Sequence, residues 1–203
     1  MKENKKAKKV VALLLCAVLL VVGSVSATVA YLTDSKSVTN TFTVGNVAIT
    51  LDEAITDKYG VATSGRTSGE TGNEYKLIPG HTYVKDPTIH VAAGSEVCYL
   101  FVKVENGISG IEGATTIADQ MNVRGWSVVD GNVYKYATTI DARNSATDID
   151  AIIFDTFTID KDKTDLTSFG DKKIIITAYA VQADGFANAD AAWGATFGPS
   201  VTP

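Results

Sequence analysis

The sequence predicts an all-β fold, a two-layer antiparallel sandwich of jelly-roll-like form with one or two short helical insertions. Three observations predict it. The chain is rich in Val, Ile, Thr, Tyr and Phe, which favour strands. Short segments alternate between apolar and polar residues, and turn sequences with Gly, Pro or Asp separate them. The 173 residues from 31 to 203 are enough for one domain with a complete core, and residues 46–203 are expected to form this domain.

The first 30 residues predict a secretory signal peptide. Five lysines precede an unbroken apolar run over residues 10–22. Small residues follow this run, and Thr28 and Ala30 suit the −3 and −1 subsites of a signal peptidase. We therefore expect cleavage between Ala30 and Tyr31, and release of the remaining chain outside the cytoplasm.

Two alternatives exist for this segment. An uncleaved membrane anchor needs about 20 apolar residues, and the run reaches that length only if it is extended through Tyr31 and Leu32. A lipid-modified Cys16 is disfavoured because Leu15 precedes it, where a small residue is expected. Cleavage would remove five lysines and one glutamate, which changes the formal charge from −5 to −9. So acidic a product argues against nucleic-acid partners and restricts membrane contact to the uncleaved precursor.

Residues 31–45 are expected to pair separately from the domain that follows them. Phe42 and Val44 occupy even-numbered positions of an alternating stretch, whereas the apolar residues over 47–51 are odd-numbered. Side chains in a strand change face at every residue, so this slip marks a bulge or a change of direction near Gly45. The segment before Gly45 is therefore a separable strand, and a second strand begins after it.

The first half of the domain is expected to contain a long loop and three strands. Residues 56–73 are rich in Gly, Ser and Thr, which is typical of an exposed loop. A Pro-Gly turn then leads to a strand that begins near Thr82, and residues 88–91 alternate between apolar and polar. After a further turn, residues 96–105 are apolar on both faces at first. This pattern predicts a central strand, antiparallel to the strand before the turn.

The second half contains the clearest hairpin of the chain, over residues 126–136. Asp130-Gly131 separates two apolar stretches, and this dipeptide suits the primed turns that match strand twist. The remaining predicted elements are a short helix over 115–121, strands over 149–159 and 173–182, and a helix over 188–193, capped by Asn188, whose Trp193 would pack on the sandwich.

Groups typical of catalysis are scarce, and the sequence predicts neither an enzyme nor a cofactor. The two histidines, His81 and His90, form no zinc motif and are expected to be solvated surface residues. The sequence contains no nucleophile elbow and no phosphate-binding glycine loop. After cleavage Cys98 would be the single cysteine, so no internal disulfide is expected. It lies in an apolar run, which favours a buried small side chain over a reactive thiol.

The densest acidic cluster contains Asp155, Asp160, Asp162 and Asp165, and it leaves calcium binding open. The spacing of Asp160 and Asp162 is similar to the start of a calcium loop, but the glycine and the closing glutamate of such loops are missing. Lysines alternate with these acids, as in a solvated turn.

Two motifs near the N-terminus carry a family resemblance. Residues 27–35 read ATVAYLTDS, and residues 40–47 read NTFTVGNV. They resemble the secreted TasA/camelysin family of Gram-positive bacteria. In that family a SipW-type signal peptidase cuts before an A-(Y/F)-x-x-D segment, and an N-T-F-x-x-G-x-(L/V) strand comes next. Weaker similarity lies in Pro79-Gly80 and in residues 85–87, 99–104 and 178–183.

The resemblance implies a jelly-roll subunit of extracellular biofilm-matrix fibres. Its partners would be other copies of itself, and the SipW-type signal peptidase during export. Residues 31–45 of one subunit would act as a donor strand that completes the sheet of its neighbour, unless they stay in their own sheet or form a tail. The even-numbered side chains that would face the acceptor are Leu32, Val38, Phe42 and Val44.

Two other functions remain open at this stage. The name camelysin implies a metalloprotease, although the sequence has no recognisable zinc motif. A cell-surface binding module without enzymatic activity is the other alternative. In that case residues 56–73 would carry recognition, because long loops on a rigid sandwich often do.

Overall fold

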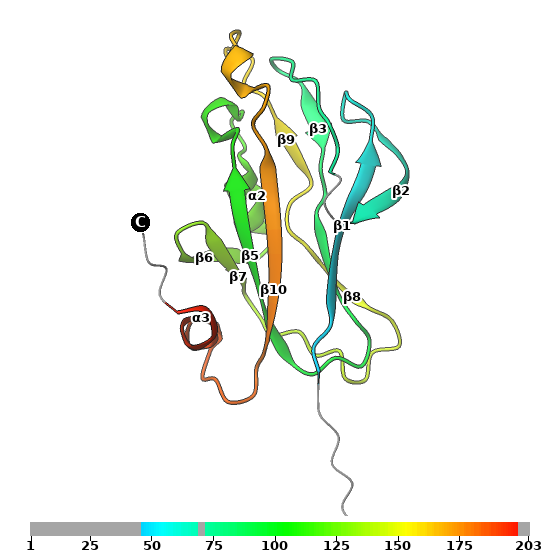
Figure 1. Ribbon diagram of the computed structural model, residues 1–203, viewed down its shortest axis with the longest axis vertical. Helices are drawn as coiled ribbons and strands as arrows, with labels where there is room; N and C mark the ends of the chain where they lie inside the picture. Colours follow the sequence, from blue (N-terminus) through cyan, green and yellow to red (C-terminus); the bar gives the residue numbers. More distant parts are fainter. Residues whose placement is uncertain (1–45, 69–71, 199–203) are drawn as a thin grey trace, which may run out of the picture. The chain divides into compact units, whose positions relative to one another are not determined.

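The computed structural model describes residues 46–68 and 72–198, which form a two-layer antiparallel β-sandwich with short helical insertions (Figure 1). The predicted fold class is therefore confirmed. One sheet has the strand order β2-β1-β4-β8, and the other has the order β10-β5-β7-β6. The strands are β1 (Ile49–Thr56), β2 (Ala62–Ser68), β3 (Thr82–Val84), β4 (Thr88–Val91), β5 (Cys98–Asn106), β6 (Trp126–Asp130), β7 (Val133–Tyr136), β8 (Ile149–Ile152), β9 (Thr156–Thr158) and β10 (Ile174–Gln182). The helices are η1 (Ser109–Ile111), α2 (Ile117–Val123), η2 (Thr167–Phe169) and α3 (Ala189–Phe197).

The small β3-β9 sheet continues the pairing of β4 with β8 in the same register. Between the two pairs, Ile153 N donates to Pro87 O at 2.9 Å and Lys85 N donates to Asp155 O at 3.0 Å. The ladder is interrupted here because Pro87 has no N–H to return. The single strand predicted over 149–159 is therefore two strands, β8 and β9, on one line.

β5 was expected to be the antiparallel partner of β4 across the turn after β4, and this prediction is wrong. β4 already lies between β1 and β8, so the chain crosses to the other sheet, where β5 pairs with β10 and β7. The central position predicted for β5 is confirmed. The two apolar faces of β5 pack against different parts of the fold. Leu100 and Val102 point into the main core, and Phe101 packs beneath α3.

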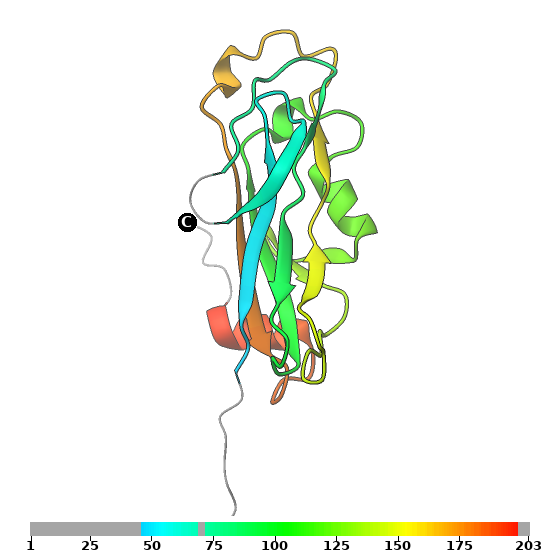
Figure 2. The ribbon, with the colours of Figure 1, turned by 90° about the vertical axis from the view of Figure 1, so that its right-hand side faces the viewer.

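The main core lies between the two sheets. Figure 2 looks onto the sheet that contains β1 (cyan), with β10 (orange) behind it. Cys98 is fully buried there, and burial raises the pKa of its thiol to about 11. The predicted buried role of this cysteine is therefore confirmed. Other fully buried side chains are Tyr83, Ile89, Val91, Leu100, Val102, Met121, Ile153, Phe154 and Ile159.

The predicted long loop over 56–73 contains a strand, β2, which pairs with β1. Asp57 closes the turn between them, because its Oδ1 accepts hydrogen bonds from the backbone N–H groups of Tyr59 and Val61, both at 2.9 Å. Gly60 follows with a positive φ of 73°. β2 is almost entirely exposed, so it carries no apolar alternation that a sequence pattern could reveal.

The hairpin of β6 and β7 and both predicted helices are present. Thr116 begins α2 with a capping box to Asp119. Asn188 caps α3 by accepting a hydrogen bond from Ala191 N at 2.9 Å. Trp193 is 9% exposed and packs on Phe101, as predicted. Within the described residues, no helix has the length and apolar character needed to cross a membrane.

Candidate functional site

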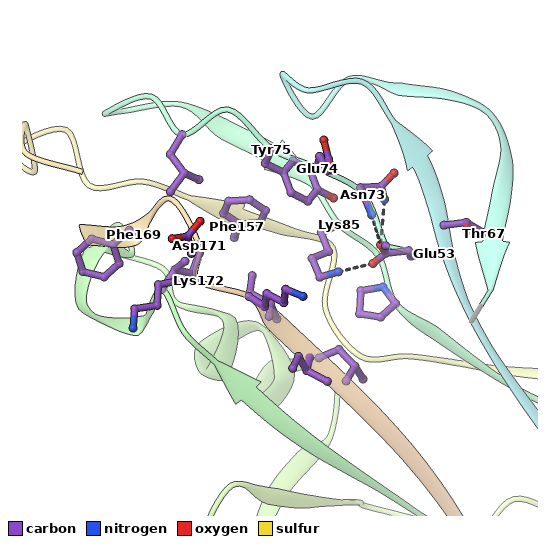
Figure 3. A pocket seen from close by; sticks show the side chains of 18 of the residues that line it. Glu53, Thr67, Asn73, Glu74, Tyr75, Lys85, Phe157, Phe169, Asp171 and Lys172 are labelled. Atoms are coloured by element: carbon purple, nitrogen blue, oxygen red, sulfur yellow. Dashed lines mark hydrogen bonds and ion pairs between the residues drawn. The ribbon is translucent and has the colours of Figure 1, made fainter. Parts of the chain in front are cut away.

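A cleft of about 950 Å³ opens between the two sheets, where β1 and the start of β10 lie on opposite sides of it (Figure 3). Within the described residues no strand closes this side: β10 is an edge strand, and the pairing of β2 with β1 begins at Asp52. The walls combine apolar and polar side chains, among them Leu51, Glu53, Asn73, Tyr75, Leu77, Lys85, Phe157, Ile174 and Ile176.

The β10 wall of the cleft is apolar. Ile174 and Ile176 point inward and are half-buried against the main core, whereas Ile175 points outward and is 46% exposed. Leu51 of β1 and Phe157 of β9 line other parts of the cleft. An apolar surface of this kind gains free energy when a partner removes it from water.

The free edge of β10 presents the backbone groups of its even-numbered residues. Gly107 N donates to Lys173 O at 2.9 Å, and Ala183 N donates to Val97 O at 2.7 Å. With the observed register, the odd-numbered residues of β10 therefore bond to β5. The N–H and C=O groups of the even-numbered residues, from Ile174 to Gln182, point away from β5, and no other strand in the described part of the chain pairs with them.

Glu53 and Lys85 form a buried ion pair on the wall of the cleft (Figure 3). They are only 8% and 7% exposed. Lys85 Nζ donates to Oε2 of Glu53, and Asn73 Nδ2 donates to Oε1 at 3.0 Å. One carboxylate thus holds an amine on one oxygen and a carboxamide on the other. Charges at this depth require such partners, because an unpaired buried charge is strongly destabilising.

Asn73 belongs to residues 72–78, called the strap below, and contacts of the strap with its neighbours fix the position of Asn73. Asn73 Oδ1 accepts a hydrogen bond from Thr56 N at 2.8 Å. Tyr75 packs edge-on against Phe157 with ring centroids 5.0 Å apart. Burial raises the pKa of Tyr75 to about 12, so its hydroxyl stays neutral at physiological pH. The strap is therefore held at Asn73 by a backbone hydrogen bond and at Tyr75 by ring packing.

His90 is not the solvated residue that was predicted. Its ring nitrogens bond to Asp52 at 2.9 Å and to Asp150 at 2.6 Å, and Asp52 also pairs with Arg66 at 2.6 Å. These residues come from neighbouring strands of the first sheet, so they form a row of charges across its outer face. His81 also has partners: its Nε2 lies 2.8 Å from Tyr59 O.

The acidic cluster does not form a metal site. Within residues 46–68 and 72–198, no three His, Cys, Asp or Glu side chains come together to hold a metal ion. Asp155 pairs with Arg124, and Asp162 pairs with Lys161 at 2.8 Å. Oδ1 of Asp165 accepts a hydrogen bond from Thr167 N at 3.1 Å. The acids are thus bound to separate local partners.

The residues predicted for cleavage and polymerisation lie outside the described residues. They are Ala30 and Tyr31 at the cleavage point, and Leu32, Val38, Phe42 and Val44 of the donor strand. Their roles stay predictions.

The chain matches no protein-family model, no curated protein and no solved structure.

Sequence patterns did not identify Glu53, Lys85 and Asn73 as site residues, although the positions of two of them gave a signal. Glu53 continues the odd-numbered inward phase of β1 after Leu51, and Lys85 continues the inward phase of Tyr83. A glutamate and a lysine that both occupy inward positions must find each other in the core. Asn73 gave no such signal, because it lies in irregular chain.

Proposed function

We propose that this protein is a secreted structural subunit of extracellular matrix fibres, in which residues 31–45 of one copy add as a strand to the next copy. The edge of β10 that no described strand pairs with, beside the apolar wall of the cleft, is the observation that carries this proposal. An edge of nine residues with free backbone groups invites strand addition unless it is covered.

The main chain and the side chains of the donor strand have complementary tasks. The even-numbered residues of β10 would exchange N–H···O=C bonds with the donor, which supplies affinity without regard to sequence. Alternate side chains of the donor would enter the cleft, and Leu32, Val38, Phe42 and Val44 supply the apolar groups. The alternation of the donor thus suits the wall formed by Ile174 and Ile176.

Export would make the donor strand available. Cleavage between Ala30 and Tyr31 by a SipW-type signal peptidase would place the donor segment at a new N-terminus. The product would carry a formal charge of −9 and would belong to the extracellular matrix or the cell surface. Its partners would be further copies of itself, because each copy carries both a donor and an acceptor.

Electron microscopy of residues 31–203 beside residues 46–203 tests the proposal. We expect filaments from the first protein and monomers from the second. A synthetic peptide of residues 31–45 should bind the shorter protein and should block filament growth of the longer one. Monomers from both proteins, or filaments from both, would contradict strand donation by this segment.

A pair of proline substitutions tests whether β10 is the acceptor. Ala178→Pro removes an N–H from the free edge and leaves the bonds to β5 in place, so the monomer should fold and filaments should fail. Thr177→Pro removes an N–H that bonds to β5, so it should destabilise the monomer itself. If the Ala178→Pro protein is folded and still forms filaments, the acceptor lies elsewhere.

A surface binding module is the second candidate, and the β1–β2 hairpin favours it. Ile55, Tyr59 and Val61 gather there and are 37%, 39% and 61% exposed. Exposed apolar side chains in one place are typical of interaction sites. If this candidate is right, Tyr59→Ser with Val61→Ser should abolish attachment to cells or matrix and leave filament formation unchanged. Loss of filaments in this variant would count against an independent binding role.

A further inference from the structure

The buried group of Lys85, Asn73 and Glu53 contains the reactants of an amide exchange. Lys85 supplies a primary amine, and Asn73 supplies a carboxamide. The two are held on the two oxygens of the same Glu53 carboxylate, so amine and amide are neighbours in the folded chain (Figure 3). Positioning of this kind converts a slow bimolecular reaction into an intramolecular one.

The Lys85–Glu53 pair lies among apolar side chains. Lys85 and Glu53 are only 7% and 8% exposed, and Leu51, Leu77 and Phe157 line the same cleft. An apolar environment penalises charges. Transfer of one proton from Nζ to the carboxylate leaves a neutral amine, which has a lone pair for attack, and a neutral acid beside the amide.

The amide is held as a substrate would be. Thr56 N donates to Asn73 Oδ1 at 2.8 Å, which is the oxygen that gains negative charge when Cγ is attacked. Nδ2 of Asn73, the nitrogen that would leave, lies 3.0 Å from Oε1 of Glu53. Glu53 therefore reaches both the attacking and the departing nitrogen.

We propose that Lys85 and Asn73 become joined by an intramolecular amide bond, which the chain forms by itself with Glu53 as the acid and base. The Nζ–Cγ bond forms and the Cγ–Nδ2 bond breaks. Glu53 takes a proton from Nζ and gives a proton to Nδ2. One ammonium ion leaves for each lysine ammonium consumed, so atoms and charges balance. The reaction needs no oxidant, metal or cofactor.

The cross-link would fasten the strap to the chain between β3 and β4. The strap forms part of the cleft wall through Asn73, Tyr75 and Leu77. A covalent bond between Asn73 and Lys85 would hold that wall closed against local opening, which non-covalent contacts alone permit. It would also replace the buried lysine ammonium with a neutral amide, whose N–H can donate to the Glu53 carboxylate.

Mass spectrometry of the purified protein tests this proposal. The wild-type protein should be lighter than its sequence by the mass of one ammonia. A trypsin digest should contain one branched peptide, in which residues 67–76 are linked to residues 77–103 and cleavage after Lys85 is missing. The variants Lys85→Arg, Asn73→Ala and Glu53→Gln should each have their full sequence mass. Lys103→Arg, at an exposed lysine paired with Glu105, is the matched control and should still lose ammonia.

Two results would overturn the proposal. One is a wild-type protein of full mass whose digest contains separate peptides 67–76 and 77–85. The other is a loss of ammonia that persists in Lys85→Arg, because an asparagine can also lose ammonia by closing on its own backbone. The wild-type digest decides the matter even if a variant does not fold.

Discussion

The two sides of this sandwich differ at their strand edges: the edge on the α2 side is covered by side chains, and the edge on the β10 side is not covered by any described element. On the α2 side, Gln120 acts in place of a neighbouring strand for β9: its Nε2 donates to Thr156 O at 2.7 Å, and its Oε1 accepts from Asp155 N and Thr156 N, both at 3.2 Å. Trp126 Nε1 donates to Ile152 O at 2.9 Å and joins the two sheets there. On the β10 side, no described element covers the edge, and a cleft of about 950 Å³ remains.

The comparison shows that the sandwich covers one strand edge with side chains and leaves the edge of β10 uncovered within the described residues. At the edge of β9, the side chain of Gln120 forms hydrogen bonds with the backbone. At the edge of β10, the backbone groups of the even-numbered residues can still bind another strand. The closed side should therefore govern the stability of the monomer, and the open side should govern assembly.

Trp126→Ala should have the largest effect on stability. Trp126 is 1% exposed, and its truncation leaves a cavity at the closed side. We expect a loss of about 3–5 kcal/mol in the free energy of unfolding, measured by urea denaturation. Ile175→Ala, at an outward residue of the open side, should lose less than about 1 kcal/mol. Similar losses in the two variants would contradict the division between the sides.

Gln120→Leu should remove the cover of the β9 edge. It leaves two backbone N–H groups and one carbonyl without their side-chain partner, and we expect a loss of about 1–3 kcal/mol. Asn122→Ala, at an exposed position of the same helix, is the control and should be nearly neutral. An equal effect of the two substitutions in urea denaturation would show that Gln120 does not protect this edge.

Ile176→Lys should separate assembly from stability. Ile176 is only half-buried beside the cleft, so a lysine can extend its ammonium group into water, and the monomer should lose about 1 kcal/mol. Filament formation, followed by electron microscopy, should stop because a charge would meet the apolar side chains of the donor. Val128→Lys, at a 58% exposed position of β6, should still allow filaments.

The charge row on the outer face of the first sheet should give the smallest effect, because its side chains are partly exposed to solvent. Desolvation lowers the pKa of His90, but hydrogen bonds with Asp52 and Asp150 outweigh it and raise the pKa above 6.5. The contribution of His90 is therefore fully present below about pH 6.5 and is lost as the pH rises through the raised pKa. Desolvation raises the pKa of Asp52, but bonds with His90 and Arg66 outweigh it, so its contribution is lost as the pH falls through a value below 3.8.

Urea denaturation across the pH range checks this prediction. His90→Gln should lower stability by about 1 kcal/mol or less below pH 6.5 and should flatten the pH dependence above it. Filament formation should be unchanged. A wild-type stability that rises between pH 6.5 and 8 would contradict the assigned sign.

The sequence predicted the elements that carry strong local patterns. The two apolar faces of β5 indicated a central strand, and Asp130-Gly131 indicated the hairpin of β6 and β7. β2 was missed because an exposed strand of Ala, Thr, Ser, Gly and Arg has no buried face. Local patterns also could not predict which strands pair with β4 and β5, because strand order depends on which strand edges already have a partner.

The candidate site was predictable only in part. Glu53 and Lys85 occupy inward positions, so a buried pair could have been inferred from strand phase alone. The cleft was not predictable, because it depends on an edge of β10 with which no other described strand pairs. The position of Asn73 could not be predicted, because it depends on the path of the strap, and the strap has no periodic sequence pattern.

Residue-resolved amide hydrogen exchange on β10 tests strand donation most directly. In residues 46–203 alone, the odd-numbered amides of β10 should be protected by β5, and those of Ile174, Ile176, Ala178 and Ala180 should exchange fast. When the peptide of residues 31–45 is added, these even-numbered amides should become protected as well. Unchanged exchange at the even-numbered amides, with new protection on another strand edge, would contradict β10 as the acceptor.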